Sequence, residues 1–222
     1  FYDGKYHLFY QANPYDTVWN AMHWGHAVST DLLNWEFLPV AIAPDLPCDQ
    51  GGCFSGSAIA MDDGRHLLVY TGVKRIQGED GRMHDLQTQC LAVGDGLNYT
   101  KYEGNPVIVP HDGLDDFRDP KVTWIDDQWV MSVAAGEVIS FYGSKDLKNW
   151  ELLPLEKSYT QARYNACPAL KYCEGYYYMF CLEAMPCYRF APYVYRTKDF
   201  ETWELGYYNP LFVPSQEDYE PK

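Results

Sequence analysis

The sequence is poor in basic residues and contains no long apolar run, and each shortage excludes a class of protein. Its 222 residues include 17 Lys and Arg against 31 Asp and Glu, which gives a formal net charge of −14. Nucleic acids and anionic membrane surfaces both require clustered positive charge, so we expect no nucleic acid and no membrane as a partner. No apolar stretch approaches the roughly 20 residues that span a bilayer.

Signatures of several common chemistries are also missing. The sequence has no Cys-x-x-Cys pair of the kind that binds zinc, no glycine-rich phosphate loop and no nucleophile elbow. We therefore expect no metal and no cofactor, and a triad built from Ser55 and His26 stays open only as an alternative. The seven cysteines have no regular spacing. This favours free thiols in a reducing compartment and predicts a cytoplasmic location.

The sequence is rich in internal repeats and in aromatic residues, which make up 17% of the chain. A turn followed by an aromatic or aliphatic strand occurs four times, starting at Asp3, Asp63, Asp126 and Glu174. No stretch has sustained helical periodicity, so the alternating strands are expected to form antiparallel meanders. A meander that recurs about every 50 residues predicts β-propeller blades, because each small sheet buries its faces only against its neighbours.

The repeats place four blades on the chain. Their expected extents are Phe1 to about Ala43, about Cys53 to Pro110, about Phe117 to Pro154, and about Tyr164 to Pro214. The predicted fold class is all-β, a five-bladed β-propeller with four blades present and incomplete at both ends. Residues 1–214 are expected to form a partial catalytic propeller, and residues 215–222 a linker toward a missing fifth blade.

A second repeated unit is a polar turn that closes on Trp. In each copy an Asp stands four residues before the Trp, at Asp31, Asp146 and Asp199. A carboxylate in this position accepts hydrogen bonds from backbone N–H groups two or three residues further on. The Trp is expected to pack between blades.

Polar residues that interrupt the strand pattern are the candidates for chemistry. Arg118 and Asp119 stand before Pro120 at the start of a predicted strand, where Asp119 can hold a pair of substrate hydroxyls and Arg118 another oxygen. A surface ion pair is the alternative. Ser55 lies beside Gly56, which permits a close backbone approach, although this segment also fits a small-residue strand near the axis. Core hydrogen bonding is the preferred interpretation for the histidines of "HWGHAVS".

Four motifs in this order resemble glycoside hydrolase family 32, the invertase, levanase and sucrose-6-phosphate hydrolase family. They are "YDGKYHLFYQANP", "WNAMHWGHAVSTDLLNWEFLPVAIAPD", "GCFSGSA" and "FRDPKV". The resemblance covers about residues 1–155. It implies a five-bladed propeller and retaining hydrolysis of β-fructofuranosides by a nucleophilic Asp and a general-acid Glu, with a third carboxylate that stabilises the transition state.

The resemblance also implies roles for individual residues. Asp119 matches the transition-state stabiliser, and Arg118 would help to hold the sugar. The positions that match contacts to the fructosyl unit are Gln11, Trp19, Phe54 and Ser55.

Two catalytic positions of the family do not carry over. The nucleophile belongs to an Asn-Asp-Pro-Asn-Gly motif expected just upstream of Phe1, and this motif is absent from the 222 residues. The general acid belongs to a Glu-Cys-Pro motif, and here Ala166 precedes Cys167 and Pro168. The 222 residues by themselves are therefore expected to be inactive.

A substitute acid is sought in the last blade, which diverges from the family. It resembles the five-bladed superfamily that includes arabinanase- and xylosidase-like enzymes. Glu183 stands on a mostly apolar strand, where burial would raise its pKa as a general acid requires. The alternative is that Glu183 faces solvent or pairs with Arg189 or Arg196. Glu137 is less favoured because a turn is expected there.

The leading hypothesis is a glycosidase that cleaves β-fructofuranosides, namely sucrose, sucrose 6-phosphate or fructan, by a retaining mechanism. Two alternatives remain. A non-catalytic carbohydrate-binding propeller would account for Ala166, and a glycosidase for another furanoside or pyranoside, such as an arabinoside or xyloside, would account for the divergent last blade.

Overall fold

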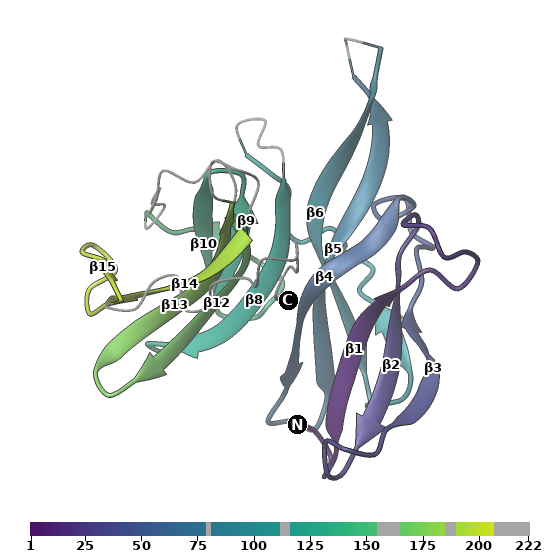
Figure 1. Ribbon diagram of the computed structural model, residues 1–222, viewed down its shortest axis with the longest axis horizontal. Helices are drawn as coiled ribbons and strands as arrows, with labels where there is room; N and C mark the ends of the chain where they lie inside the picture. Colours follow the sequence, from purple (N-terminus) through teal and green to yellow (C-terminus); the bar gives the residue numbers. More distant parts are fainter. Residues whose placement is uncertain (79–80, 112–115, 155–164, 185–189, 207–222) are drawn as a thin grey trace. The chain divides into compact units, whose positions relative to one another are not determined.

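The computed structural model describes residues 1–78, 81–111, 116–154, 165–184 and 190–206. The chain divides into two compact units, Phe1–Arg118 and Asp119–Lys222, and each is considered by itself. Every regular element in the described part is a β-strand, and each sheet is antiparallel with its strands in chain order (Figure 1). The predicted all-β fold is confirmed, while the predicted linker at 215–222 lies outside the described residues.

The first unit contains two sheets. The three-stranded sheet comprises β1 (Tyr6–Ala12), β2 (His23–Ser29) and β3 (Glu36–Ile42). The four-stranded sheet comprises β4 (Gly52–Ala60), β5 (His66–Gln77), β6 (Met83–Gly94) and β7 (Tyr99–Lys101). These sheets correspond to the first two blades expected from the repeats.

The second unit also contains two sheets. The first comprises β8 (Phe117–Ile125), whose two leading residues still belong to the first unit, followed by β9 (Gln128–Ala135), β10 (Val138–Ser144) and β11 (Glu151–Leu152). The other comprises β12 (Asn165–Cys173), β13 (Tyr176–Ala184), β14 (Phe190–Thr197) and β15 (Glu204–Leu205). They match the expected third and fourth blades.

The hairpin turns follow directly from the repeated sequence. Asp3 and Gly4 have φ angles of 45° and 74°, and they close a backbone pair between Tyr2 and Lys5. Positive φ at both central residues matches the right-handed twist of the flanking strands. The Glu174–Gly175 turn repeats this geometry, with φ angles of 48° and 81°.

The Trp-closed turns also have the predicted chemistry. Oδ1 of Asp146 accepts hydrogen bonds from the N–H groups of Lys148 at 2.9 Å and Asn149 at 2.8 Å. Asp31 and Asp199 bind the equivalent N–H groups in their own turns. These bonds lower the pKa of the Asp146 carboxyl, with the Asn149 N–H as the largest cause.

The core of each unit lies between its two sheets. In the first unit Trp24 and Ile42 pack with Leu68 and Tyr70 of the neighbouring sheet. In the second unit the core joins one side of β9–β10 to β13–β14, and its buried members are Ile125, Val130, Ile139, Phe141, Leu170, Met179, Cys181 and Tyr195. Trp203 stacks on Phe141 of the other sheet at 6.4 Å, as expected for a Trp that packs between blades.

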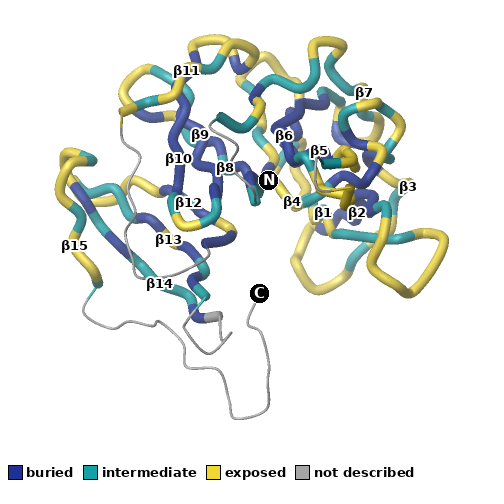
Figure 2. Tube along the Cα trace, turned by 90° about the horizontal axis from the view of Figure 1, so that it is seen from above, coloured by how far each residue is buried: buried dark blue, intermediate teal, exposed yellow. Residues whose placement is uncertain are grey.

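Burial along the chain fits blades that are covered on both faces. The middle strands β9 and β10 are almost entirely buried (Figure 2), whereas the turns between strands are exposed. Among the described residues, no helix is long and apolar enough to cross a membrane.

Candidate active site

The sharpest feature of the second unit is the contact between Asp119 and Cys167. Asp119 stands near the start of β8, and Cys167 lies in β12, the first strand of the other sheet. The Cys167 N–H donates to Oδ2 of Asp119 at 3.0 Å, and the Cys167 Sγ lies 3.5 Å from the same oxygen. The Asp119 carboxylate is thereby fixed in orientation.

Both residues adopt an unusual backbone conformation. Asp119 has φ of 60° and Cys167 has φ of 51°, in the left-handed region that costs a non-glycine residue about 1 to 2 kcal/mol. Backbone strain of this kind clusters at functional sites, where the surrounding structure holds it in place. The pair is therefore a functional-site candidate on conformational grounds.

A β-bulge accounts for the exposed backbone N–H of Cys167. The pairing of β12 with β13 shifts register between Ala166 and Ala169, which leaves Cys167 and Pro168 outside the ladder. A bulge frees one residue from the ladder and redirects its groups. Ala166 itself is buried and brings no ionisable group to the position where the family has Glu.

Arg118 precedes Asp119 on β8, at the end of the first unit. Its Nη1 donates to Oδ1 of Asp116 at 2.6 Å and to Oε1 of Gln87 at 3.2 Å, and the side chain is 16% exposed. Arg118 therefore does form an ion pair, with Asp116, but its side chain is largely buried and not at the surface. This pairing fixes the direction of the guanidinium.

The first unit brings together three of the four predicted fructosyl-binding positions. The exposed ring of Trp19 meets the edge of Phe54 at 5.3 Å, with the ring planes 64° apart. Gln11 donates from Nε2 to the carbonyl of Cys53 at 3.0 Å. Trp19 in the loop after β1, Gln11 of β1 and Phe54 of β4 therefore lie together near the start of β4.

Ser55 is placed by a second bulge. The register of β4 with β5 shifts between Phe54 and Gly56, so Ser55 is unpaired and its side chain is exposed. A Cβ at Gly56 would lie 1.9 Å from the carbonyl oxygen of Val69. The close backbone approach predicted for Gly56 is thus confirmed, and it is what allows Ser55 to project outward.

Gln11 carries a further signal that sequence reasoning missed. Its Oε1 is buried and has no hydrogen-bond partner among the described residues. Buried polar atoms are nearly always paired, so an unpaired one calls for an explanation. An acceptor left open beside Trp19 and Phe54 is consistent with a binding role for Gln11.

Glu183 is buried, with 4% of the residue exposed. Its Oε1 accepts a hydrogen bond from the Tyr195 hydroxyl at 2.5 Å and lies 3.8 Å from the Cys181 Sγ. Burial is the largest cause that raises the pKa of Glu183 above its ordinary value, and these two hydrogen bonds oppose it. The solvent-facing alternative is wrong, and Arg196 pairs instead with Glu204 at 2.7 Å.

Other expected residues are placed more simply. Arg189 lies outside the described residues, and Glu137 lies in an exposed turn as anticipated. His26 is fully buried and shares a 3.0 Å hydrogen bond with His7, which favours the core interpretation over a triad with Ser55. The described part of the chain contains no cluster of three or more His, Cys, Asp or Glu side chains suited to a metal ion.

Four antiparallel sheets, each with its strands in chain order, define a protein of the β-propeller class. The comparisons with known proteins specify it further. Residues 1–175 match the model of the glycosyl hydrolases family 32 N-terminal domain. The chain therefore belongs to glycoside hydrolase family 32.

Individual relatives agree with this assignment. The chain is 47% identical over 156 residues to a levanase of Bacillus subtilis, a match that covers 68% of this chain and 22% of the levanase. It is 38% identical to a sucrose-6-phosphate hydrolase of Escherichia coli, covering 67% of this chain and 32% of that protein. The chain thus matches about a fifth to a third of the length of these relatives.

Solved structures extend the likeness to the last sheet. A β-fructofuranosidase of Bombyx mori, solved as a mutant in complex with sucrose, has a TM-score of 0.79 and 34% identity, covering 94% of this chain and 47% of that one. A sucrose-6-phosphate hydrolase of Lactobacillus gasseri has a TM-score of 0.75 and 29% identity, covering 89% and 43%. The divergent fourth sheet thus keeps the family's architecture even though the family model ends at residue 175.

Proposed function

We propose that the protein to which this chain belongs hydrolyses β-fructofuranosides, namely sucrose, sucrose 6-phosphate or fructan, by a retaining mechanism. The observation that carries the proposal is Asp119, held in a strained backbone with one carboxylate oxygen bound by the Cys167 N–H. A fixed carboxylate can accept two sugar hydroxyls and strengthen those bonds as the ring flattens toward an oxocarbenium ion. The names of the relatives and the sucrose complex of one neighbour support this substrate class.

In this proposal the first unit supplies sugar binding. The Trp19 and Phe54 rings offer an apolar surface for the face of a sugar, while Gln11 and Ser55 offer polar groups at its edge. Arg118 contributes positive charge, although its ion pair with Asp116 leaves it a positioning role as well. Binding groups on strands hold a ligand more rigidly than groups on loops alone.

The test of the proposed function is an activity panel on the full-length protein with sucrose, sucrose 6-phosphate and inulin. Asp119→Asn is expected to lower kcat/KM by about 10²- to 10³-fold, because the neutral amide loses the charge that the transition state requires. Asp127→Asn is the matched control, since Asp127 is an exposed turn residue that also has positive φ. Wild-type activity in Asp119→Asn, or no cleavage of any fructoside, would refute the proposal.

Glu183 is proposed as the general acid in place of the missing Glu at position 166. The raised pKa keeps its carboxyl protonated further toward neutral pH, as a proton donor requires. We expect Glu183→Gln to lower kcat on sucrose by about 10²- to 10⁴-fold. The loss should be much smaller on an aryl fructoside, whose leaving group needs little protonation. Glu151→Gln, an exposed strand residue, serves as control; equal losses on both substrates would instead indicate a structural role.

Two alternatives are tested by adding calorimetry and aryl pentosides to this panel. A carbohydrate-binding propeller without turnover, which would account for Ala166, would show calorimetric fructoside binding and no product. A glycosidase for another sugar would cleave aryl arabinosides or xylosides faster than sucrose.

A further inference from the structure

Two cysteines that are not among the candidate site residues face each other in the first unit. Cys48 lies in the turn that precedes β4, and Cys90 lies in the middle of β6. Their Sγ atoms are 3.9 Å apart, and both thiols are free. A disulfide requires about 2.0 Å between the sulfurs, so rotation of the two side chains has to close a gap of about 2 Å.

The turn that carries Cys48 is held firmly in place. Asp49 is fully buried, and its Oδ1 accepts the Leu46 N–H at 2.8 Å. Its Oδ2 accepts the Tyr70 hydroxyl at 2.8 Å and the Lys101 ammonium at 2.5 Å. Lys101 also donates to the Ala43 carbonyl. The approach of Cys48 to β6 is therefore set by a buried polar network.

A glycine packs against both the Cys90 side chain and the Cys48 backbone. Gly72 lies on β5 between the turn and β6, and a Cβ there would be 2.9 Å from the Cys90 Sγ and 3.1 Å from the Cys48 carbonyl oxygen. A larger residue at position 72 would crowd the Cys90 sulfur and the Cys48 backbone. Glycine at this position lets the turn and β6 approach each other closely.

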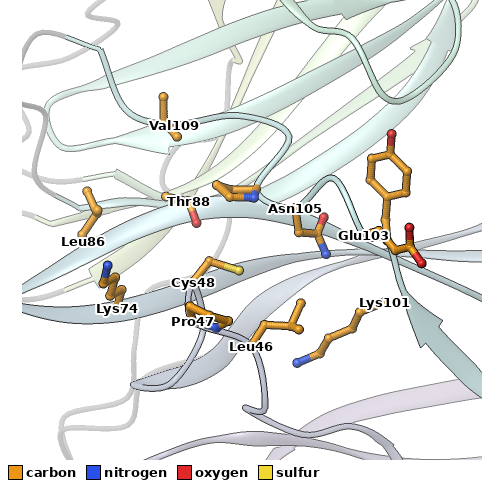
Figure 3. Close-up of a pocket in the computed structure, with 12 residues that line it drawn as sticks. Leu46, Pro47, Cys48, Lys74, Leu86, Thr88, Lys101, Glu103, Asn105 and Val109 are labelled. Carbon is orange, nitrogen blue, oxygen red and sulfur yellow. The ribbon is translucent and has the colours of Figure 1, made fainter.

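Only one of the two thiols is accessible. Cys48 is half-buried and lines a pocket of about 460 Å³ together with Pro47, Thr88 and Asn105 (Figure 3). Cys90 is fully buried. The hydrogen bond from Cys90 is the largest cause that lowers the pKa of Cys48, and the same pair raises the pKa of Cys90. Cys48 is therefore the thiol that a reagent in the pocket would meet first and find more reactive.

We propose that Cys48 and Cys90 form a reversible disulfide when the protein meets a small disulfide oxidant of the glutathione class. The Cys48 thiolate attacks one sulfur of glutathione disulfide, the S–S bond of the oxidant breaks, and one glutathione thiolate leaves. Cys90 then attacks the Cys48 sulfur, and its proton passes to the second glutathione as that thiolate is displaced. Two protein thiols are oxidised, and one glutathione disulfide is reduced to two thiols.

The cross-link would act on a segment close to the candidate binding residues. The Cys48 turn runs directly into β4, which carries Phe54 and Ser55. Tying the turn to β6 closes a loop across the unit and reduces the motion of residues 44–51. The modification itself does not depend on the proposed function.

The experiment treats the full-length protein with defined ratios of oxidised to reduced glutathione, traps free thiols with N-ethylmaleimide and maps unreduced peptides by mass spectrometry. We expect a Cys48–Cys90 linked peptide that disappears on addition of dithiothreitol. Amide exchange of residues 44–51 should slow by about tenfold on oxidation. Cys173→Ser, which removes an exposed cysteine, should leave both results unchanged, whereas Cys48→Ser should abolish both.

Three results would overturn the proposal. One is glutathione attached to Cys48 with no link to Cys90. Another is a link from Cys48 to Cys53 in place of Cys90. The third is a native protein in which Cys48 and Cys90 both remain free at every ratio. Because these readouts come from the wild-type protein, they do not depend on whether a variant folds.

Discussion

At the scale of the single residue, the burial of Glu183 affects both the stability of the folded protein and the ability of its carboxyl to donate a proton. Its carboxyl is buried, and its Oε1 contacts Tyr195 and Cys181, two members of the core of the second unit. Burial disfavours the ionised form, which raises the pKa. A carboxyl with a raised pKa is suited to give a proton, and its burial is also a cost to folding wherever the pH forces it to ionise.

The direction in which this folding cost changes with pH can be measured. A folded-state pKa above the unfolded value of about 4.3 means that the contribution of Glu183 to stability is present below that value and is lost as the pH rises through the folded pKa. Glu183→Gln imitates the protonated form at every pH. We expect its melting temperature, relative to wild type, to rise between pH 4 and pH 8.

Thermal unfolding of both proteins at pH 4, 6 and 8 checks this expectation. Glu151→Gln, at an exposed position, should show no comparable trend. A constant difference between Glu183→Gln and wild type across the three pH values would mean that the pKa of Glu183 is the same in the folded and unfolded protein.

At the scale of the element, the bulge in β4 is the feature that converts a strand into a binding surface. It exposes Ser55 and depends on Gly56, where the Val69 carbonyl leaves no room for a Cβ. Gly56→Ala is expected to lower the free energy of unfolding by about 3 kcal/mol, through overpacking against backbone that cannot move freely.

Chemical denaturation measures this effect, with Gly64→Ala as the matched control. Gly64 has φ of +83° but open space around it, so its substitution should cost only about 1 kcal/mol. Gly56 itself has no positive φ, so equal losses in both variants would mean that the close approach to the Val69 carbonyl adds nothing to the cost expected at an open glycine.

A second element-scale feature is a histidine cluster that joins the two sheets of the first unit. His7 and His26 share a hydrogen bond, and His66 lies 5.1 Å from His7 between ring centres. Burial is the largest cause that lowers the pKa of His26 and of His66, in each case to about 4. A lowered pKa means that protonation of these histidines is less favourable in the folded state than in the unfolded state. The contribution of the two neutral histidines to stability is present above about pH 6.5 and is lost as the pH falls toward 4.

We therefore expect wild-type stability to decline between pH 6.5 and pH 4, and His66→Phe to flatten that decline. Phe keeps a ring against Tyr2, which stacks on His66 at 4.4 Å, but cannot be protonated. Melting temperatures across this range provide the measurement, with the exposed His84→Asn as control. An unchanged slope in His66→Phe would show that acid lability arises elsewhere.

At the scale of the whole molecule, the structural features that could be predicted are those that depend on residues close together in the sequence. The hairpin at Asp3, the turn at Asp146 and the close approach at Gly56 each depend on residues a few positions apart, and the structure confirms all three. Periodic strands and turns were sufficient to predict four antiparallel sheets and their order. Local rules are reliable here because each sheet is built from sequential neighbours.

The remaining features depend on pairings distant in the sequence. The contact of Asp119 with Cys167 joins residues 48 positions apart, and that of Cys48 with Cys90 joins residues 42 apart. Strand patterns specify which face a side chain takes, but not which residue of another strand it meets or where a bulge shifts the register. The partners of Glu183 and the histidine cluster were missed for the same reason.

Catalysis is also a property of the whole molecule. Family resemblance assigns the nucleophile to an Asn-Asp-Pro-Asn-Gly motif, and these 222 residues do not contain it. We expect residues 1–222 expressed alone to release no fructose from sucrose, while the full-length protein does so. Measuring reducing sugar after long incubation checks this, and turnover by the 222 residues alone would place the nucleophile within them.

The three Trp-closed turns have one further consequence. Each is built the same way, with a hydroxyl at Ser29, Ser144 or Thr197, an Asp two residues later, and a Trp whose indole N–H returns to the chain. The same turn motif therefore occurs at three places in one protein, each with different surroundings. One substitution made separately in each copy would hold the local chemistry constant, and any spread among the three results would report what the surroundings contribute to a motif.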